Sequence, residues 1–367
     1  IAQNADQYLG GYFRYFTDLP TEQAYPMSVL FPAKGEMTTI TSSSPYNPLP
    51  PAWFRRGIGN RLGAPYFRTF RYTDLYDAKL MEAYICDHKC KTVGLIAPSL
   101  LNYKLVNYLK TALPDVTFID ATELIDEIKA VKSEDEIQAI RRTVALHDQV
   151  LQMVPGILHP GMYEYEVVAE MNRVAESNNC ELSFATIATI NGQTLHNHYH
   201  GNKVKPGDLF LIDAGAEVES GYAGDMSSTV PADKKFTARQ REVYEIQNAM
   251  HLESVKALRP GIPYMEVYEL SARVMVDSMK ALGLMKGNTE DAVREGAHAL
   301  FYPHGLGHMM GLDVHDMENL GEIWVGYNGQ PKSTQFGRKS QRLAIPLEPG
   351  FVHTVEPGIY FIPELID

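Results

Sequence analysis

The stretch HGLGHMMGLDVHD, at residues 304–316, places three histidines and two aspartates within thirteen positions. Its glycines allow the imidazoles of His304 and His308 to share a tight turn, because glycine adopts backbone conformations that other residues avoid. Imidazoles near carboxylates are typical ligands of transition metals. This stretch therefore indicates a metal site, with further ligands expected elsewhere in the chain.

Three carboxylates in the same half of the chain are candidates for those ligands. Asp213 ends the apolar, strand-like run 209–212, and Asp225 follows twelve residues later in the sequence GYAGD. Glu356 follows the apolar run 351–355. A carboxylate at the end of an apolar strand is unfavourable unless it is paired or coordinates a cation. Each residue alone is more typical of a turn or cap, but together they form an oxygen-rich set.

That donor set combines carboxylates with imidazole and contains no thiolate. It suits manganese, iron(II) or cobalt better than a structural zinc ion, which favours cysteine and histidine. Carboxylates can also bridge, so two ions about 3.5–4 Å apart are expected. We therefore predict two divalent metal ions, with manganese preferred and iron, cobalt or zinc as alternatives.

The composition disfavours several other classes of function. Asp and Glu number 45 against 33 Lys and Arg, giving a formal net charge of −12. An acidic surface does not suit a phosphate backbone or an anionic lipid surface. No apolar run reaches the 18 or so residues that a membrane span needs. We predict neither nucleic acid nor membrane as a partner.

The three cysteines are too few for a disulfide framework. Cys86 and Cys90 are four residues apart, but no second pair completes a metal site, so we predict reduced thiols in a cytoplasmic protein. The chain begins at Ile1 without a basic, apolar leader, and no signal peptide is expected. Because a natural start would be Met, we expect the sequence to be a fragment.

The first 125 or so residues alternate strand-like and helix-like segments. Strands are predicted at 27–31, 37–42, 92–97 and 116–119, and a helix is predicted at 100–113. The first two strands are separated by PAKGE and should form a hairpin. The aromatic segment 8–16 is expected to be core or interface. This pattern predicts a small α/β domain over residues 1–130.

A second domain, over residues 131–367, is expected to begin with a helix. Ser133 and Glu136 form a capping box that opens a helix through about Val154. After this helix, HPG at 159–161 and RPG at 259–261 form an echo with an offset of 100 residues, each between two helical stretches. Such an echo predicts a duplicated half-domain with a site between the halves.

Four of these motifs occur in the order seen in a known family: a strand followed by DAG, then GYAGD, HGLGHMMGLDVHD and EPGIY. The chain resembles the Xaa-Pro peptidases, aminopeptidase P and prolidase, which are pita-bread metallopeptidases. The likeness covers about 133–360, and residues 1–125 resemble a creatinase-type amino-terminal domain. It implies an α/β (α+β) fold, in which that small domain precedes a pseudo-twofold catalytic domain.

The resemblance implies that Asp213, Asp225, His308 and Glu356 are metal ligands. Asp225 would bridge the two ions, and Asp213 and His308 would lie on opposite ones. The family has a fifth ligand, a glutamate that follows Glu356 by a few tens of residues. We expect that residue beyond Asp367, so that the carboxy-terminal end of the domain is truncated in this sequence.

The resemblance also implies that His304 and His315 hydrogen-bond the substrate. His196 lies 17 residues before Asp213, where the family has a further substrate-side histidine. His198 is the alternative, because it precedes a tyrosine, as that histidine commonly does; we prefer His196 because it needs no gap.

The chain departs from the family pattern at residues 227–229, where SST replaces the TRT of many aminopeptidase P sequences. This departure weakens an assignment to a subfamily but replaces none of the expected ligands. The segment between Asp316 and Leu347 is long and includes three basic residues, at 338, 339 and 342. They could receive a substrate carboxylate, but a solvated basic loop is the favoured interpretation.

The function implied by the resemblance is that of an Xaa-Pro aminopeptidase, a hydrolase that releases the residue before proline. Its partner would be a peptide with proline in the second position, and the enzyme would be a cytoplasmic homodimer. The near alternative is a prolidase that cleaves only Xaa-Pro dipeptides. The sequence leaves open the choice between them, the native metal and the residue preferred before proline.

Other uses of the same scaffold are less favoured. Creatinase works without metal and has no need of four ligands, and a pseudopeptidase that only grips partner proteins would tend to lose them. A lyase remains an alternative because fold does not determine function. A methionine aminopeptidase is disfavoured by the separate preceding domain.

Overall fold

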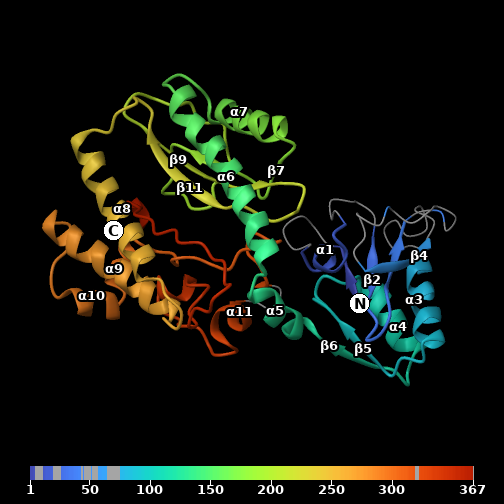
Figure 1. Ribbon diagram of the computed structural model, residues 1–367. Coiled ribbons are helices and arrows are strands. Elements are labelled where there is room, and N and C mark those ends of the chain that lie inside the picture. The colour runs from blue at the N-terminus through green and yellow to red at the C-terminus, as the bar shows by residue number, and fades with distance from the viewer. Residues whose placement is uncertain are drawn as a thin grey trace. The chain divides into compact units, whose positions relative to one another are not determined.

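The computed structural model describes residues 1–4, 11–19, 26–42, 44, 51, 57–63, 75–318 and 322–366. Their contacts divide the chain into two compact units, residues 1–129 and 130–367. This division lies one residue before the boundary expected from the sequence. Both units contain helices and strands (Figure 1), and the predicted α/β fold class is confirmed.

The first unit is built on two small sheets. Its described elements are β1 (Ala2–Gln3), α1 (Gly11–Thr17), β2 (Ser28–Leu30), β3 (Met37–Thr41), β4 (Ile58–Gly63), α3 (Tyr76–Asp87), β5 (Thr92–Leu95), α4 (Tyr103–Ala112), β6 (Thr117–Asp120) and α5 (Thr122–Ala130). One sheet has the order β1-β2-β3-β4, and β5 pairs with β6 in parallel. The predicted hairpin is confirmed, because β2 and β3 are antiparallel neighbours.

Two further predictions for this unit concern a helix start and the aromatic segment. The helix predicted from residue 100 begins at Tyr103. The Asn102 side chain accepts hydrogen bonds from the amides of Lys104 and Leu105 and so caps the helix at this point. In the aromatic segment, Tyr12 and Phe13 are buried on α1, in agreement with a core role. Residues 8–10 of that segment lie outside the described residues.

The second unit begins with the predicted capping box. The Ser133 side chain accepts from the Glu136 amide, and the Glu136 carboxylate accepts from the Ser133 amide. The helix runs to residue 157, three residues beyond the prediction. The described elements are α6 (Glu134–Ile157), α7 (Glu164–Ser177), β7 (Glu181–Leu182), β8 (Ile187–Thr189), β9 (Leu209–Ala214), β10 (Ala216–Glu217), β11 (Met226–Pro231), α8 (Ala238–Ala257), α9 (Tyr264–Ala281), α10 (Thr289–Arg294) and α11 (Glu322–Tyr327), with short 3-10 turns at Ala297–Leu300, Arg338–Ser340 and Pro363–Leu365.

The echo of 100 residues is a structural repeat. Helices α6 and α8 end at residues 157 and 257, and α7 and α9 begin at 164 and 264. In each turn the glycine amide donates to a later strand-like segment, from Gly161 to the Val204 carbonyl and from Gly261 to the Leu347 carbonyl, both at 2.8 Å. The pseudo-twofold pattern expected of a pita-bread domain is therefore present in the backbone.

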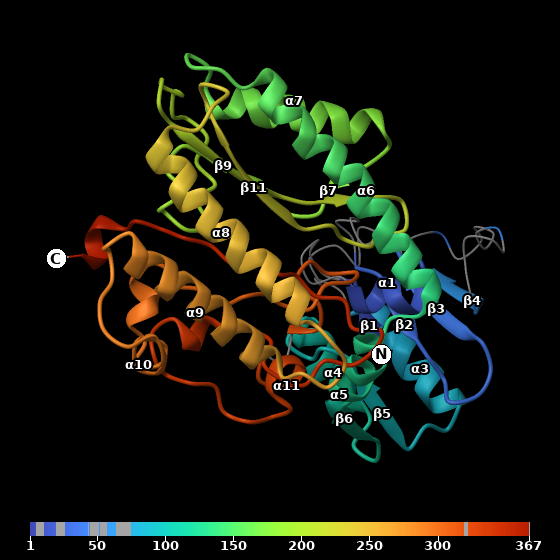
Figure 2. The same ribbon diagram turned by 60° about the vertical axis from the view of Figure 1, so that its left-hand side comes forward.

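The first half of this repeat places helices on one face of a sheet. The sheet has the order β11-β9-β8, and Figure 2 shows α6 and α7 along one side of it. Phe210, Ile212 and Ala214 of β9 are buried with residues of these helices. Because side chains alternate along a strand, the residues between them face away from the helices.

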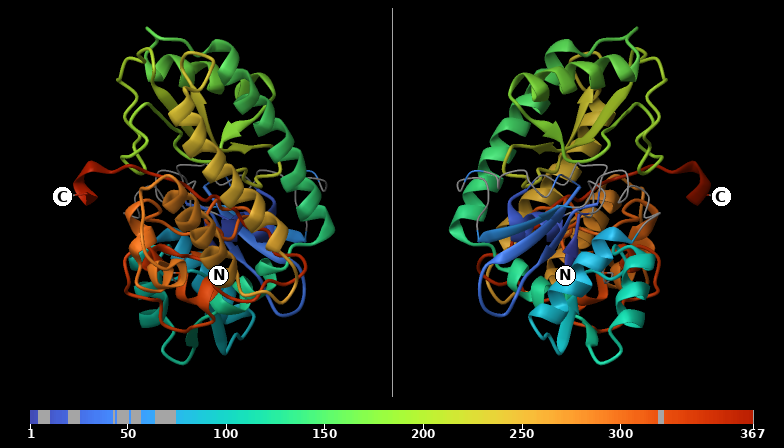
Figure 3. Two further views of the ribbon diagram at one scale, coloured as in Figure 1. Left: turned by 90° about the vertical axis from the view of Figure 1, so that its left-hand side faces the viewer. Right: turned by 90° about the vertical axis from the view of Figure 1, so that its right-hand side faces the viewer.

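The second half packs around α8 and α9, which run side by side in Figures 2 and 3. Its core includes the buried rings of Tyr264, Tyr268 and Tyr302. The segment that follows, through Glu318, carries the histidine-rich stretch in an irregular backbone. Across the described residues, no helix combines the length and apolarity required to cross a membrane.

A buried ion pair ties the start of this unit to the histidine-rich stretch. Lys132 Nζ lies 2.9 Å from Asp316 Oδ2, and each side chain is 1% exposed. The Lys132 amide also donates to the Gly350 carbonyl at 2.8 Å. Lys132, two residues before α6, is therefore held against two segments that lie about 200 residues later in the chain.

Lys132→Met should lower the free energy of unfolding by about 3–5 kcal/mol, because it leaves a buried carboxylate without its cation. The measurement is urea denaturation followed by circular dichroism. Arg173→Met is the matched control, since Arg173 pairs with Glu170 on the surface, where the side chains are 63% and 44% exposed, and should cost no more than about 1 kcal/mol. Equal effects of the two variants would contradict the prediction.

Candidate metal centre

Two strands bring the first predicted ligands to one place. β9 and β11 are antiparallel neighbours in which Asp213 lies opposite Ser227. Asp225 comes two residues before Ser227 and therefore lies at the same end of the sheet. Asp213 alternates with the buried Ile212 and Ala214, so its side chain is on the face directed away from α6 and α7.

Two irregular segments carry the other predicted ligands to this point. The Thr354 amide donates to the His308 carbonyl at 2.9 Å, and the Glu356 amide donates to the Leu306 carbonyl at 2.8 Å. Gly307 permits this close approach, because a Cβ at that position would collide with the Thr354 carbonyl oxygen. The histidine-rich stretch and the segment of Glu356 thus run together through their backbones.

Three of the four predicted ligands converge. Asp225, His308 and Glu356 each offer one ligand atom, and these atoms all lie within 4.8 Å of one another. His308 Nε2 is 3.1 Å from Asp225 Oδ2 and 3.3 Å from Glu356 Oε1. Asp213 is not a member of this tight group, although it lies near enough for its charge to interact with both carboxylates.

The other atoms of these side chains are fixed by hydrogen bonds. His308 Nδ1 lies 2.9 Å from the Met309 carbonyl, so this nitrogen carries a proton and donates. The Thr354 hydroxyl accepts from the His308 amide at 3.0 Å and donates to Glu356 Oε1 at 2.7 Å. One hydroxyl therefore links two of the three converging residues.

The excess of negative charge at the centre would favour a bound cation. Burial raises the pKa of Asp213 to about 8, and the charges of Asp225 and Glu356 act in the same direction. Burial alone would lower the pKa of His308, but the hydrogen bond to Asp225 and the charge of Glu356 outweigh it and raise the pKa to about 9. Negative charge is therefore concentrated here beyond what neighbouring groups neutralise.

The residues present fit a divalent cation. With its proton on Nδ1, a neutral His308 directs the lone pair of Nε2 toward two carboxylate oxygens, an arrangement that is repulsive without a cation between them. Nitrogen and oxygen donors of this kind suit divalent transition metals. The Met309 carbonyl supplies the outer hydrogen bond that metal-binding histidines usually make.

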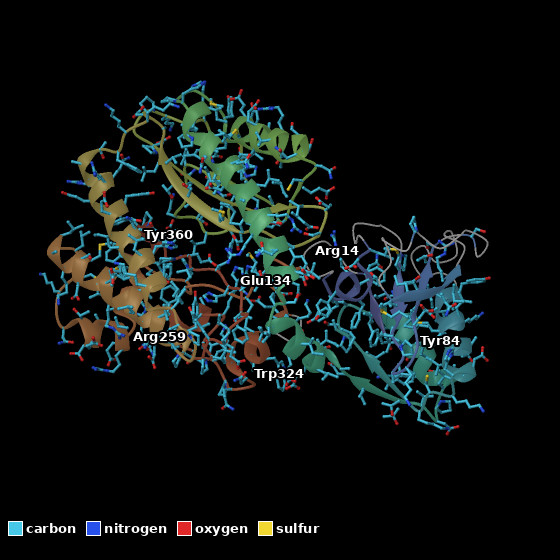
Figure 4. The ribbon with its side chains drawn as sticks, in the orientation of Figure 1. Arg14, Tyr84, Glu134, Arg259, Trp324 and Tyr360 are labelled. Atoms are coloured by element: carbon cyan, nitrogen blue, oxygen red, sulfur yellow. The ribbon has the colours of Figure 1, made fainter. Side chains whose placement is uncertain are left out.

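His304 lies on the same turn as His308 and has one free ring nitrogen. Its Nδ1 is 2.7 Å from the Gly305 carbonyl, whereas its Nε2 is buried without a hydrogen-bond partner in the described part of the chain. Its ring meets those of Tyr302 and Tyr360 edge-on, and Figure 4 marks Tyr360. Burial lowers the pKa of His304, against the charge of Glu356, which raises it.

His315 is stacked on His308, with ring centroids 3.8 Å apart and planes at 18°. Its Nδ1 lies 3.2 Å from Glu318 Oε2, and burial lowers its pKa against the effect of this carboxylate. Glu318 also accepts from Arg342 Nη1 at 2.6 Å. A chain of charged contacts therefore leads from the centre to a guanidinium.

The third predicted substrate-side histidine lies on an exposed loop. His196 is exposed, its φ is 55°, and it lies close enough for its charge to lower the pKa of His304. His198, the alternative, is also exposed. His200 is partly buried, with Nε2 3.0 Å from the Thr186 carbonyl.

Residues 138–366 match the model of metallopeptidase family M24, which is more than half of the chain. The chain belongs to this family. M24 membership implies divalent metal ions, and Asp225, His308 and Glu356 form a group of described residues that could hold one. The predicted membership in the Xaa-Pro peptidase group is confirmed by the relatives described next.

Curated relatives agree with the family. The chain is 37% identical over 257 residues to Xaa-Pro aminopeptidase of Escherichia coli, covering 68% of this chain and 52% of that protein. It is 32% identical over 251 residues to Xaa-Pro dipeptidase of mouse, covering 66% and 50%. This M24 chain therefore spans about half the length of the curated relatives it matches.

Solved structures agree with the pita-bread fold. Proline aminopeptidase P II from Yersinia pestis is similar with a TM-score of 0.74 and 29% identity, covering 96% of this chain and 79% of that one. The likeness therefore extends through both units of the M24 chain, including the part before residue 138.

One sequence-based expectation about this M24 centre is wrong, and one contact was not expected. The Ser227 hydroxyl donates to Asp213 Oδ1 at 3.0 Å, so the departing segment supports a predicted ligand. The basic segment is not simply solvated: Arg338 pairs with Glu269 at 2.5 Å and Arg342 pairs with Glu318 at 2.6 Å, and both guanidinium groups are partly buried. Only Lys339 of the three basic residues is exposed.

Several residues that shape the centre carry no short motif. Thr354 and Glu318 belong to this group. One signal for the C-terminal segment was present: KPGDLFLIDAG at 205–215 and EPGFVHTVEPG at 348–358 align without a gap at an offset of 143. This alignment places Asp213 and Glu356 at equivalent positions of the two halves.

Thr354→Val should weaken the binding of Mn²⁺ by about 10–100-fold, because it removes the hydroxyl that links the His308 amide to Glu356. The measurement is calorimetric titration of the metal-free protein with Mn²⁺. Thr354→Ser, which keeps the hydroxyl, should bind Mn²⁺ nearly as the unmodified chain does. If serine and valine behaved alike, the hydroxyl would have no part in holding the ligands.

Proposed function

We propose that this chain carries the catalytic centre of an Xaa-Pro aminopeptidase, which hydrolyses the bond between an amino-terminal residue and proline. The observation that carries the proposal is the convergence of Asp225, His308 and Glu356 in an M24 metallopeptidase. The 37% identity to an Escherichia coli protein named Xaa-Pro aminopeptidase supports the choice of substrate.

Two divalent ions, manganese in the first place, would be held by Asp213, Asp225, His308 and Glu356. Their function would be to polarise the scissile carbonyl and to make a water molecule more acidic. The raised pKa of Asp213 supports its inclusion, because a buried carboxylate among other carboxylates is stabilised by a cation. Asp225 lies 3.1 Å from His308 Nε2, and its charge acts on Asp213, so it would be the ligand shared by the two ions.

The histidines would handle the substrate. His304 has its Nδ1 committed to a backbone carbonyl and a buried, unpartnered Nε2, so Nε2 is the atom available to the peptide. His315 is held by Glu318 and stacked on His308, which orients its ring beside the ligands. His196 is exposed near His304, at a position where it could reach the same peptide.

A carboxylate beside the water would take its proton and pass it to the departing proline nitrogen. Glu356 suits this step better than Asp225, because its side chain is 35% exposed against 11%. Its Oε1 is engaged by Thr354 and His308, whereas no hydrogen bond from a described residue engages Oε2. The proton would therefore be held at Oε2.

A prolidase acting on Xaa-Pro dipeptides is the second candidate, and one observation favours it. Arg342 is 34% exposed and shares Glu318 with His315, so a guanidinium lies one side chain from a substrate-side histidine. A guanidinium binds a carboxylate in a bidentate manner, and a dipeptide ends in a carboxylate beside its proline ring. The identity to mouse Xaa-Pro dipeptidase also supports this alternative.

The proposal extends to a cytoplasmic homodimer. The cysteines Cys86, Cys90 and Cys180 are unpaired, which fits a reducing compartment. Light scattering after size exclusion tests the oligomeric state directly, because a monomeric mass would remove the dimer from the proposal.

The purified protein loaded with Mn²⁺ should cleave an Xaa-Pro-Yaa tripeptide, and Asp225→Asn should reduce kcat/KM by at least about 10³-fold, since it removes a charge at the centre. The measurement is release of the first amino acid, with the matched Xaa-Pro dipeptide run in parallel. Cleavage of the dipeptide alone would identify a prolidase. Failure to cleave either, with Mn²⁺ bound, would contradict the peptidase function.

Arg342→Gln separates the two substrate classes. If a dipeptide carboxylate binds Arg342, its KM should rise about 10–100-fold, the value of a lost charged hydrogen bond, while the KM of a tripeptide amide should change little. Lys339→Gln is the control, because Lys339 is basic and exposed on the same segment. Equal changes for both substrates would remove the observation that favours a prolidase.

A further inference from the structure

Two side chains of α8 hold the backbone on both sides of Glu356. Gln247 Nε2 donates to the Pro357 carbonyl at 2.9 Å, and His251 Nδ1 lies 3.1 Å from the Val355 carbonyl. The two residues are one helical turn apart, so both point from the same face of α8. The carbonyls that flank Glu356 are therefore fixed from the helix behind them.

The repeat within the domain gives Gln247 an equivalent in the other half. The helices repeat at an offset of 100, which aligns Gln247 with His147 of α6. The strand-like segments repeat at an offset of 143, which aligns Pro357 with Ala214, the residue after Asp213. The repeat predicts that His147 faces the Ala214 carbonyl.

His147 lies where that equivalence requires it. Its side chain is fully buried, and the carbonyls of Ala214 and Met226 lie beside its ring. Ala214 and Met226 are directly paired in the sheet and follow Asp213 and Asp225 in the chain. Neither ring nitrogen has a hydrogen bond of good geometry to a described residue, so an imidazole N–H is available to one of these carbonyls.

The neighbouring residues of α6 do not account for an imidazole at position 147. One turn earlier, Thr143 donates to the Tyr222 carbonyl at 3.0 Å, and one turn later Val150, Leu151 and Val154 belong to the apolar core. The residue equivalent to His251 is the apolar Leu151. Of the two α8 positions that contact the segment of Glu356, only that of Gln247 has a polar side chain at the equivalent place on α6.

We propose that His147 and Gln247 are equivalent positioning residues, each holding the carbonyl of the residue that follows a metal-binding carboxylate. His147 positions Asp213, and through Met226 also Asp225, whereas Gln247 positions Glu356 with the help of His251. This assignment rests on the proposed function, because it takes these carboxylates as metal ligands. Residues that orient ligands in this way typically change metal affinity 10–100-fold.

The test is calorimetric titration of the metal-free protein with Mn²⁺, with thermal unfolding of the same metal-free samples. His147→Leu and Gln247→Met remove the polar group at each position with little change in volume. His147→Gln introduces at the first position the amide that performs this role at the second. Glu242→Gln, on the exposed face of α8, is the control for a change on the helix alone.

We expect His147→Leu and Gln247→Met to weaken Mn²⁺ binding about 10–100-fold, and His147→Gln to restore it to within about threefold of the control. In turnover of a tripeptide at saturating Mn²⁺, kcat should fall more than KM rises, because the peptide-binding histidines are unchanged. If His147→Leu does not fold, Gln247→Met and His147→Gln carry the same test.

The proposal is overturned if Gln247→Met, or a folded His147→Leu, binds Mn²⁺ as the control does, even when its unfolding temperature is lower. Loss of binding in His147→Gln equal to that in His147→Leu would also overturn it, because an amide should serve in place of the imidazole. Absence of Mn²⁺ binding in the unmodified chain is a different result, which would reject the proposed function.

Discussion

The catalytic unit is organised around one unfavourable arrangement, the gathering of carboxylates in a partly buried place. Asp213 and Asp225 lie at the same end of two paired strands, whereas Glu356 comes from a segment more than 100 residues later. Burial and the charges of Asp225 and Glu356 raise the pKa of Asp213. Side chains would separate under this repulsion unless the backbone prevented it. Much of the surrounding structure can be understood as backbone support against that separation, with a cation as the remaining counterbalance.

The support is built by repetition. Each half uses two helices joined by a Pro-Gly turn, a backbone hydrogen bond from that glycine, and a strand-like segment that ends in a carboxylate. The first half pairs its strand within a sheet, whereas the second half pairs the Glu356 segment with the histidine-rich stretch. The same plan thus delivers an aspartate from one side and a glutamate with an imidazole from the other.

Much of this could be predicted from the sequence, because the decisive signals are local. The capping box at Ser133, each of the two Pro-Gly turns and the histidine-rich stretch are contained in short segments of sequence. The roles of Ser227 and Thr354 could not be predicted, since their partners lie across a strand pair or between irregular segments. Arg342 was misjudged for a similar reason: its partner Glu318 is 24 residues away.

Gly307 affects the centre through the space between two backbone segments. A Cβ there would press on the carbonyl of Thr354, in the segment that carries Glu356, although residue 307 itself contacts no metal-binding atom. The space available at residue 307 is therefore set by the distance between two backbone segments. A residue with a side chain at position 307 would therefore displace the segment that carries Glu356.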